Sequence, residues 1–128
     1  MVIQVVLDTN FLVYCAENKV DYASGIDEIM TEGFELVVPS QVISELENLS
    51  VKAEKYSTKI AARLALKIIG SNKVKVLKIE AGYADEAILK MAKQNNVIAA
   101  TIDSELRKKI GRTVRGVTIE GRRKIAFD

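Results

Sequence analysis

The sequence predicts an α/β fold, a three-layer α/β/α sandwich around a central parallel sheet of about five strands. Short apolar runs typical of strands alternate along the chain with segments whose apolar residues recur at helical spacing. The 128 residues are 48% hydrophobic and 28% charged, which is typical of a globular chain that buries its own core. We therefore expect residues 1–128 to form a single domain.

The elements follow one another without a linker, a repeat or a low-complexity tract. Strands are expected at 2–7, 36–38, 73–79, 97–102 and 117–119, with a terminal edge strand at 125–127. Helices are expected from Phe11 with Asn10 or Thr9 as its cap, then at 22–31, 41–50, 57–69 and 83–94, and up to Ile110 from a cap at Asp103 or Ser104.

Four acidic residues stand just beyond four of these strands. Asp8 follows the first strand, Glu45 lies in the helix after the second, Asp85 opens the helix after the third, and Asp103 ends the fourth. The carboxyl ends of parallel neighbours share one edge of a sheet, where open α/β folds place their sites. Four carboxylates gathered there would repel one another unless a cation lay among them. The arrangement predicts a divalent-metal site.

Each acid also has a purely structural alternative. Asp8 and Asp103 could be ordinary helix N-caps, although a cap alone does not require the run Asp8-Thr9-Asn10. Asn10 is a candidate for orienting Asp8, and Thr101 could orient a ligand or be a plain strand residue.

Two of the acids have a neighbour of the same kind nearby. Helical periodicity does not separate Glu45 from Glu47, because both flank the apolar stripe of their helix. It does separate Asp85, on the edge of the apolar stripe, from Glu86, which points nearly away from it.

Residue types that are missing narrow the chemistry. The chain has no histidine, which excludes histidine-based triads and the usual zinc sites, so a metal would be held by oxygen and would be Mg²⁺ or Mn²⁺. The single cysteine, Cys15, cannot form an intrachain disulfide and is expected to be a buried apolar residue. Because no signal peptide or membrane-spanning run is evident, we expect a cytoplasmic protein with no membrane partner.

Positive charge gathers near the C-terminus. Residues 107–124 contain eight basic residues and one acid, whereas the rest of the chain is acidic on balance. A basic segment that begins next to a carboxylate site suggests a polyanion held beside a metal, although it could be only a solvated surface. The candidates for contact with such a polyanion are Arg107, Lys108, Arg112 and Arg115.

The ordered motifs resemble those of the PIN-domain nucleases over nearly the whole chain. They are Leu7-Asp8-Thr9-Asn10, then Pro39-Ser40 followed by Val42-Ile43-Ser44-Glu45-Leu46, then Ala84-Asp85-Glu86-Ala87-Ile88-Leu89, and Ala100-Thr101-Ile102-Asp103-Ser104-Glu105-Leu106. The resemblance implies that Asp8, Glu45, Asp85 and Asp103 are catalytic and metal-binding, with Asn10 and Thr101 supporting them. It favours Glu45 over Glu47.

The resemblance implies a metal-dependent endoribonuclease that leaves 5′-phosphate and 3′-hydroxyl ends. The branch that matches best is the ribosomal-RNA-processing (Fcf-like) one, and the VapC-type toxins are the nearest alternative. RNA is the expected partner, together with a homodimer and either a ribosome-assembly protein or an antitoxin. A non-catalytic RNA-binding module is a rival. A phosphatase of the haloacid-dehalogenase type is disfavoured because it needs an aspartate where Asn10 stands.

Overall fold

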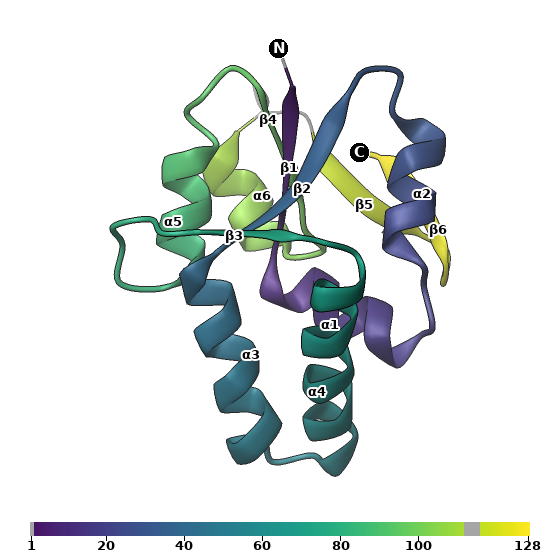
Figure 1. Ribbon diagram of the computed structural model, residues 1–128, viewed down its shortest axis with the longest axis vertical. Coiled ribbons are helices and arrows are strands. Elements are labelled where there is room, and N and C mark those ends of the chain that lie inside the picture. The colour runs from purple at the N-terminus through teal and green to yellow at the C-terminus, as the bar shows by residue number, and fades with distance from the viewer. Residues whose placement is uncertain (1, 112–115) are drawn as a thin grey trace.

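The computed structural model describes residues 2–111 and 116–128, and they share one six-stranded sheet of order β3-β2-β1-β4-β5-β6 (Figure 1). The strands are β1 (Ile3–Leu7), β2 (Phe34–Pro39), β3 (Lys75–Leu77), β4 (Val97–Ala100), β5 (Gly116–Glu120) and β6 (Lys124–Phe127). The first five strands of this order are parallel, and β6 pairs antiparallel with β5. The predicted α/β class with five parallel strands is therefore confirmed, and a sixth strand forms the edge.

Within the described residues, six helices flank this sheet. They are α1 (Thr9–Glu17), α2 (Tyr22–Ile29), α3 (Ser40–Lys52), α4 (Tyr56–Ser71), α5 (Ala84–Met91) and α6 (Ser104–Ile110). Figure 1 shows α3 and α4 as an antiparallel pair that extends beyond the end of the sheet where β1 and β2 finish. The end of the sheet that carries the predicted acids is thus also the end at which α1, α3 and α5 begin.

The central strands are buried on both faces. Every residue of β4 is buried, as are Val5, Val6 and Leu7 of β1. Successive side chains of a strand point to opposite faces, so burial of consecutive residues means that helices cover both sides of the sheet. This double cover is why these strands are continuous apolar runs in the sequence.

The order of the strands reverses at β1. From β1 the chain moves to β2 and β3 on one side, and then it crosses to β4 on the other side of β1. Leu7 and Ala100 are register partners, so Asp8 and Thr101 are the next residues along the two strands. Open α/β sheets bind ligands at such a reversal of strand order, beyond the carboxyl ends of the strands.

Several element boundaries differ from the sequence prediction. Helix α1 begins at Thr9, and its N-cap is Asp8 rather than Thr9 or Asn10, because the Asp8 carboxylate accepts a hydrogen bond from the Thr9 amide. Helix α4 continues through Gly70 to Ser71, since a glycine near the last turn weakens a packed helix without ending it. Strand β3 is only Lys75–Leu77, less than half the expected length.

Two smaller expectations concern Cys15 and membrane-spanning segments. Cys15 is buried at 1% exposure, as predicted, and burial raises the pKa of its thiol to about 12. Among the helices of residues 2–111 and 116–128, none has the length and apolarity that crossing a membrane requires.

Two helical glycines give opposite predictions for substitution by alanine. A Cβ at Gly25 in α2 would lie 2.5 Å from Ile125 Cγ1 and 2.9 Å from its Cβ, so α2 would have to move away from β6. Overpacking of this kind costs roughly 1–3 kcal/mol, which outweighs a gain in helix propensity of about 1 kcal/mol. We expect Gly25→Ala to lower the free energy of unfolding measured in urea.

The matched variant is Gly70→Ala in α4. A Cβ there would have no heavy atom within 4 Å, so only the gain in helix propensity remains, and we expect stabilisation by up to about 1 kcal/mol. Stabilisation by both substitutions would contradict the close packing of α2 on β6.

Candidate functional site

Asp8 lies at the centre of the site, at the carboxyl end of the central strand. The residue is 3% exposed, and each carboxylate oxygen accepts one hydrogen bond. Oδ1 accepts from the Thr9 amide at 2.8 Å, and Oδ2 accepts from Thr101 Oγ1 at 2.7 Å. The carboxylate is therefore held in one orientation by groups from α1 and from the end of β4.

Thr101 links two of the predicted acids. Its hydroxyl donates to Asp8 and accepts a hydrogen bond from the Asp103 amide at 3.0 Å, and the whole residue is 2% exposed. The Thr101 amide donates to the Val117 carbonyl at 3.1 Å, which fixes the backbone of this segment against β5. A threonine that makes these bonds orients Asp8 and sets the start of the segment that carries Asp103.

Glu45 and Asp85 lie close enough to Asp8 for their charges to act on it. Burial raises the pKa of Asp8 from 3.8 to about 6, and the carboxylates of Asp85 and Glu45 add to the increase against the opposing hydrogen bonds from Thr101 and Thr9. Desolvation also raises the pKa of Glu45, and Asp85 adds to that increase. The structure thus brings Asp8, Glu45 and Asp85 together electrostatically.

The neighbouring acids are placed differently. Glu45 and Glu47 are both exposed on α3, but neither the charge of Glu47 nor that of Glu86 contributes to the raised pKa of Asp8 or Glu45. Glu86 is exposed and accepts a hydrogen bond from the Gly82 amide at 3.1 Å, whereas Asp85 is half-buried. The electrostatic coupling to Asp8 therefore distinguishes Glu45 from Glu47, and both coupling and burial distinguish Asp85 from Glu86.

Thr9 is a residue of the site that sequence reasoning missed. It is 2% exposed, and its hydroxyl lies beside Glu45 and lowers the pKa of that carboxyl. The contact is loose, because Oγ1 has no hydrogen-bond partner of ordinary geometry among the described residues. A buried hydroxyl without a partner is uncommon in a folded protein and is expected where a ligand or its bound water completes a site. The signal in the sequence was its position between Asp8 and Asn10.

Asp103 is the N-cap of α6, at the end of the segment that follows β4. Its Oδ1 caps α6 by accepting hydrogen bonds from the amides of Glu105 and Leu106, at 2.9 and 3.4 Å. Asp103 and Asn10 line a shallow open groove together with Val13, Tyr14, Glu17, Ile102 and Ser104. The carboxylate is half-buried, so helix capping and exposure to this groove coexist in one side chain.

The four carboxylates do not form a single closed set of ligands. Within residues 2–111 and 116–128, no three Asp, Glu, His or Cys side chains are arranged to hold one metal ion. The donors nevertheless suit Mg²⁺ or Mn²⁺, because Mg²⁺ usually keeps several waters and binds through one or two carboxylates. No described lysine or arginine forms an ion pair with any of the four. The chemistry of this site therefore fits a hydrated divalent cation.

The predicted RNA-contacting residues have different environments. Arg107 on α6 forms an ion pair with Asp128, with 2.9 Å between Nε and Oδ2, so part of its charge is neutralised within the protein. Lys108 is exposed, and no described acid forms an ion pair with it. Arg112 and Arg115 lie outside the described residues.

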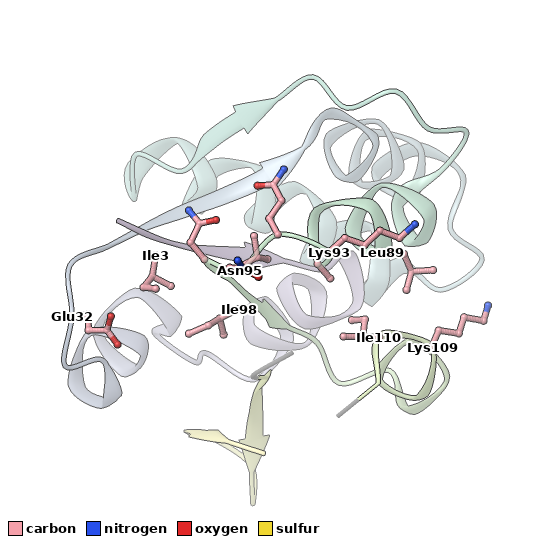
Figure 2. A pocket seen from close by; sticks show the side chains of 12 residues that line it. Ile3, Glu32, Leu89, Lys93, Asn95, Ile98, Lys109 and Ile110 are labelled. Atoms are coloured by element: carbon pink, nitrogen blue, oxygen red, sulfur yellow. The ribbon is translucent and has the colours of Figure 1, made fainter. Parts of the chain in front are cut away.

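A separate pocket lies away from the carboxylates. It is lined by the starts of β1 and β4, the end of α5 and the end of α6, and includes Ile3, Leu89, Ile98 and Ile110 with Lys93 and Lys109 (Figure 2). None of the four predicted acids lines it. The candidate site is thus not this hollow but the more open surface where β1 and β4 end.

The chain matches a known protein family over most of its length. The sequence pattern of a family described as a PIN like domain matches residues 5–123. The match covers more than half of the chain, and the chain therefore belongs to the PIN-domain family, as its resemblance to that family suggested.

Relatives of known name include both expected branches. Ribonuclease VapC4 from Methanocaldococcus jannaschii is 41% identical over 109 residues, which cover 84% of this chain and 82% of that protein. The rRNA-processing protein FCF1 from Saccharomyces cerevisiae is 29% identical over 119 residues, which cover 91% of this chain. The same alignment covers 58% of FCF1, so the chain spans less than two thirds of that protein.

Solved structures show the same fold. The PIN domain endonuclease Utp24 superposes with a TM-score of 0.81 at 23% identity, over 98% of this chain and 90% of that one. VapBC2 from Rickettsia felis, bound to a DNA fragment from its promoter, gives a TM-score of 0.63 at 18% identity. This match covers 90% of the present chain and 98% of the VapBC2 chain. At these identities the likeness concerns the fold alone.

The raised pKa of Asp8 predicts how stability changes with pH in metal-free protein. Between pH 3.8 and about 6 the folded state binds more protons at Asp8 than the unfolded state does, so stability must fall as pH rises. A shift of about two pH units corresponds to about 3 kcal/mol at pH 7. We expect urea denaturation in EDTA to show this decline for wild type and a smaller one for Asp8→Asn.

Glu47→Gln is the control for this experiment, because Glu47 is exposed on α3 and should leave the pH dependence as it is in wild type. An equal decline in Asp8→Asn and wild type would show that the Asp8 carboxyl is not the group responsible.

Proposed function

We propose that the chain is a divalent-metal-dependent endoribonuclease that hydrolyses phosphodiester bonds in RNA. Asp8, Glu45, Asp85 and Asp103 would be its catalytic and metal-binding residues, with Mg²⁺ or Mn²⁺ as the cofactor. The observation that carries this proposal is the buried Asp8 carboxylate. Its neighbours at the site are further carboxylates, and no described lysine or arginine forms an ion pair with it. A bound cation would offset the repulsion and the desolvation together.

The roles of the protein groups follow from their placement. Asp8 is the fixed ligand, since Thr101 and the Thr9 amide hold both of its oxygens. Glu45 and Asp85 add carboxylate oxygens from α3 and α5, and Asp103 adds them from the start of α6. When bound, the cation would lower the pKa of a water molecule and stabilise charge on the phosphate. The chain has no histidine, so carboxylates are the groups that would accept protons here.

RNA as the substrate is supported by the named relatives and by surface charge. The relatives are a ribonuclease and an rRNA-processing protein. Lys108 lies on α6, the helix that Asp103 caps, and is exposed. Lysine contacts to phosphates position a strand without reading its sequence. Aromatic residues make up only 5% of the chain, so selectivity would come from RNA shape or a partner protein.

Cleavage of a structured RNA with Mn²⁺ tests the catalytic proposal. We expect cutting that is abolished by EDTA and reduced by about two to three orders of magnitude in Asp8→Asn and in Glu45→Gln, because each removes negative charge that would hold the metal. Products should carry 5′-phosphate ends, as detected by ligation.

The matched control for Glu45→Gln is Glu47→Gln, which makes the same chemical change one half-turn further along α3 and should cleave as wild type does. Binding of RNA without any cleavage, together with no Mn²⁺ binding by calorimetry, would establish the rival reading of a non-catalytic RNA-binding module.

Two biological roles are compatible with this chemistry. A role in rRNA processing is supported by the alignment with FCF1 across 91% of the chain, and the partner would then be a ribosome-assembly protein. A role as a VapC-type toxin is supported by the higher identity to Ribonuclease VapC4, 41% over 82% of its length, and the partner would then be an antitoxin. A homodimer is compatible with either role.

Expression in a bacterial host distinguishes the two roles. If the chain is a toxin, induction of wild type should arrest growth, and Asp8→Asn, which lacks the central carboxylate, should relieve the arrest. If the chain processes rRNA, we expect growth to continue and purified protein to cut a ribosomal-RNA precursor at one site. Both outcomes are read from growth curves and from mapping of the RNA ends.

A further inference from the structure

Asp85 lies on the most weakly anchored element of the candidate site. Strand β3, which precedes it, has only three residues at the edge of the sheet, and Lys75 and Val76 are exposed. The segment 78–83 between β3 and α5 makes no strand pairing. The sheet therefore fixes Asp85 less well than it fixes Asp8, and other contacts must set its position.

Gln41 on α3 makes such contacts. Its Nε2 donates to the Ile79 carbonyl at 2.6 Å and to the Ala81 carbonyl at 2.9 Å, and Ser40 Oγ donates to its Oε1 at 3.4 Å. Both N–H groups and the oxygen of the carboxamide are thus engaged, which fixes the orientation of the amide. Ala81 is four residues before Asp85, so these bonds hold the entry to α5.

The other bonds to this segment come from α5 itself. Lys90 Nζ donates to the Glu80 carbonyl at 2.5 Å, and Glu86 accepts from the Gly82 amide at 3.1 Å. They hold the segment to its own helix but not to the rest of the site. Among the described side chains that hydrogen-bond this segment, Gln41 therefore stands apart. It belongs to α3, the helix that carries Glu45, and not to α5.

Gln41 also shares a face of α3 with Glu45. The two residues are four positions apart in a helix that spans Ser40–Lys52, so their side chains project from the same side, one turn apart. Gln41 bonds to the segment that enters α5, and α3 packs against α5, so this side of α3 faces the start of α5. The same face of α3 therefore carries Glu45 and Gln41, whose bonds fix the segment that leads to Asp85.

We infer that Gln41 is a positioning residue that sets the separation between Asp85 and Glu45, and through it the affinity of the site for a divalent cation. The inference rests on the proposed function, because it assumes that both carboxylates serve one cation. Groups that orient metal ligands typically change affinity about 10–100-fold when they are removed. The substitution that tests this role is Gln41→Met, which keeps the approximate length and volume of the side chain but has no donor for the two carbonyls.

The experiment compares Mn²⁺ binding by calorimetry in wild type, Gln41→Met and Asn96→Ala. The control variant loses a similar side-chain-to-backbone bond, from Asn96 Nδ2 to the Val2 carbonyl at 3.1 Å, at the opposite end of the sheet. We expect the Mn²⁺ dissociation constant to rise about 10-fold or more in Gln41→Met and less than about twofold in Asn96→Ala. A purely structural role would move the two affinities alike.

Amide hydrogen exchange of the metal-free proteins is the second measurement. In Gln41→Met the amides of residues 79–87 should exchange faster, with the central strands unchanged. Unchanged exchange there, or wild-type Mn²⁺ affinity in Gln41→Met, would overturn the inference. Failure of wild type to bind Mn²⁺ would instead overturn the proposed function, and faster exchange in Gln41→Met would still support the role of Gln41 in holding the entry to α5.

Discussion

The hydrogen bond from Thr101 to Asp8 is the interaction on which the rest of the site depends. It joins the ends of β1 and β4 at 2.7 Å and partly stabilises a carboxylate that is almost fully buried. Burying a charge without an opposite partner is costly, and hydrogen bonds recover only part of that cost. The pKa of Asp8 shows the balance, since it stays raised at about 6 despite two hydrogen bonds that lower it.

This constraint explains why the neighbouring groups are arranged as they are. A buried charge at the centre of the sheet lowers the stability of the fold. Groups that lower stability in this way are commonly found at functional sites, where a bound ligand compensates for them. Glu45 and Asp85 make the cost larger, because each adds negative charge near Asp8. The same residues that destabilise the protein without a ligand are therefore those that would hold a cation under the proposed function.

The fold and the position of Asp8 could be predicted because both follow from local rules. Apolar runs specify buried strands, parallel strands bring their carboxyl ends to one edge, and Asp8 and Thr101 each stand directly beyond such an end. Asp85 could be separated from Glu86 because helical periodicity places one near the buried face of α5 and the other away from it.

Other features depend on tertiary contacts that no local pattern contains. Glu45 and Glu47 differ only in which side of α3 meets α5, which the sequence periodicity does not determine. The bonds of Gln41 reach a segment almost forty residues away. The pairing of Arg107 with Asp128 likewise joins α6 to the residue after β6, and a charge count alone treats Arg107 as free to bind RNA.

The separation of Asp8 and Thr101 along the chain has a consequence for the order of events in a cell. The two residues are 93 positions apart, so β1, the central strand of the sheet, is made well before its neighbour β4. During translation the central strand must wait for its second partner, so the hydroxyl that orients the carboxylate is made 93 residues after the carboxylate itself. Non-local closure of this kind is slow relative to helix formation. A nascent chain therefore carries the Asp8 carboxylate without its Thr101 bond until β4 has been made, and the candidate site cannot be complete before that point.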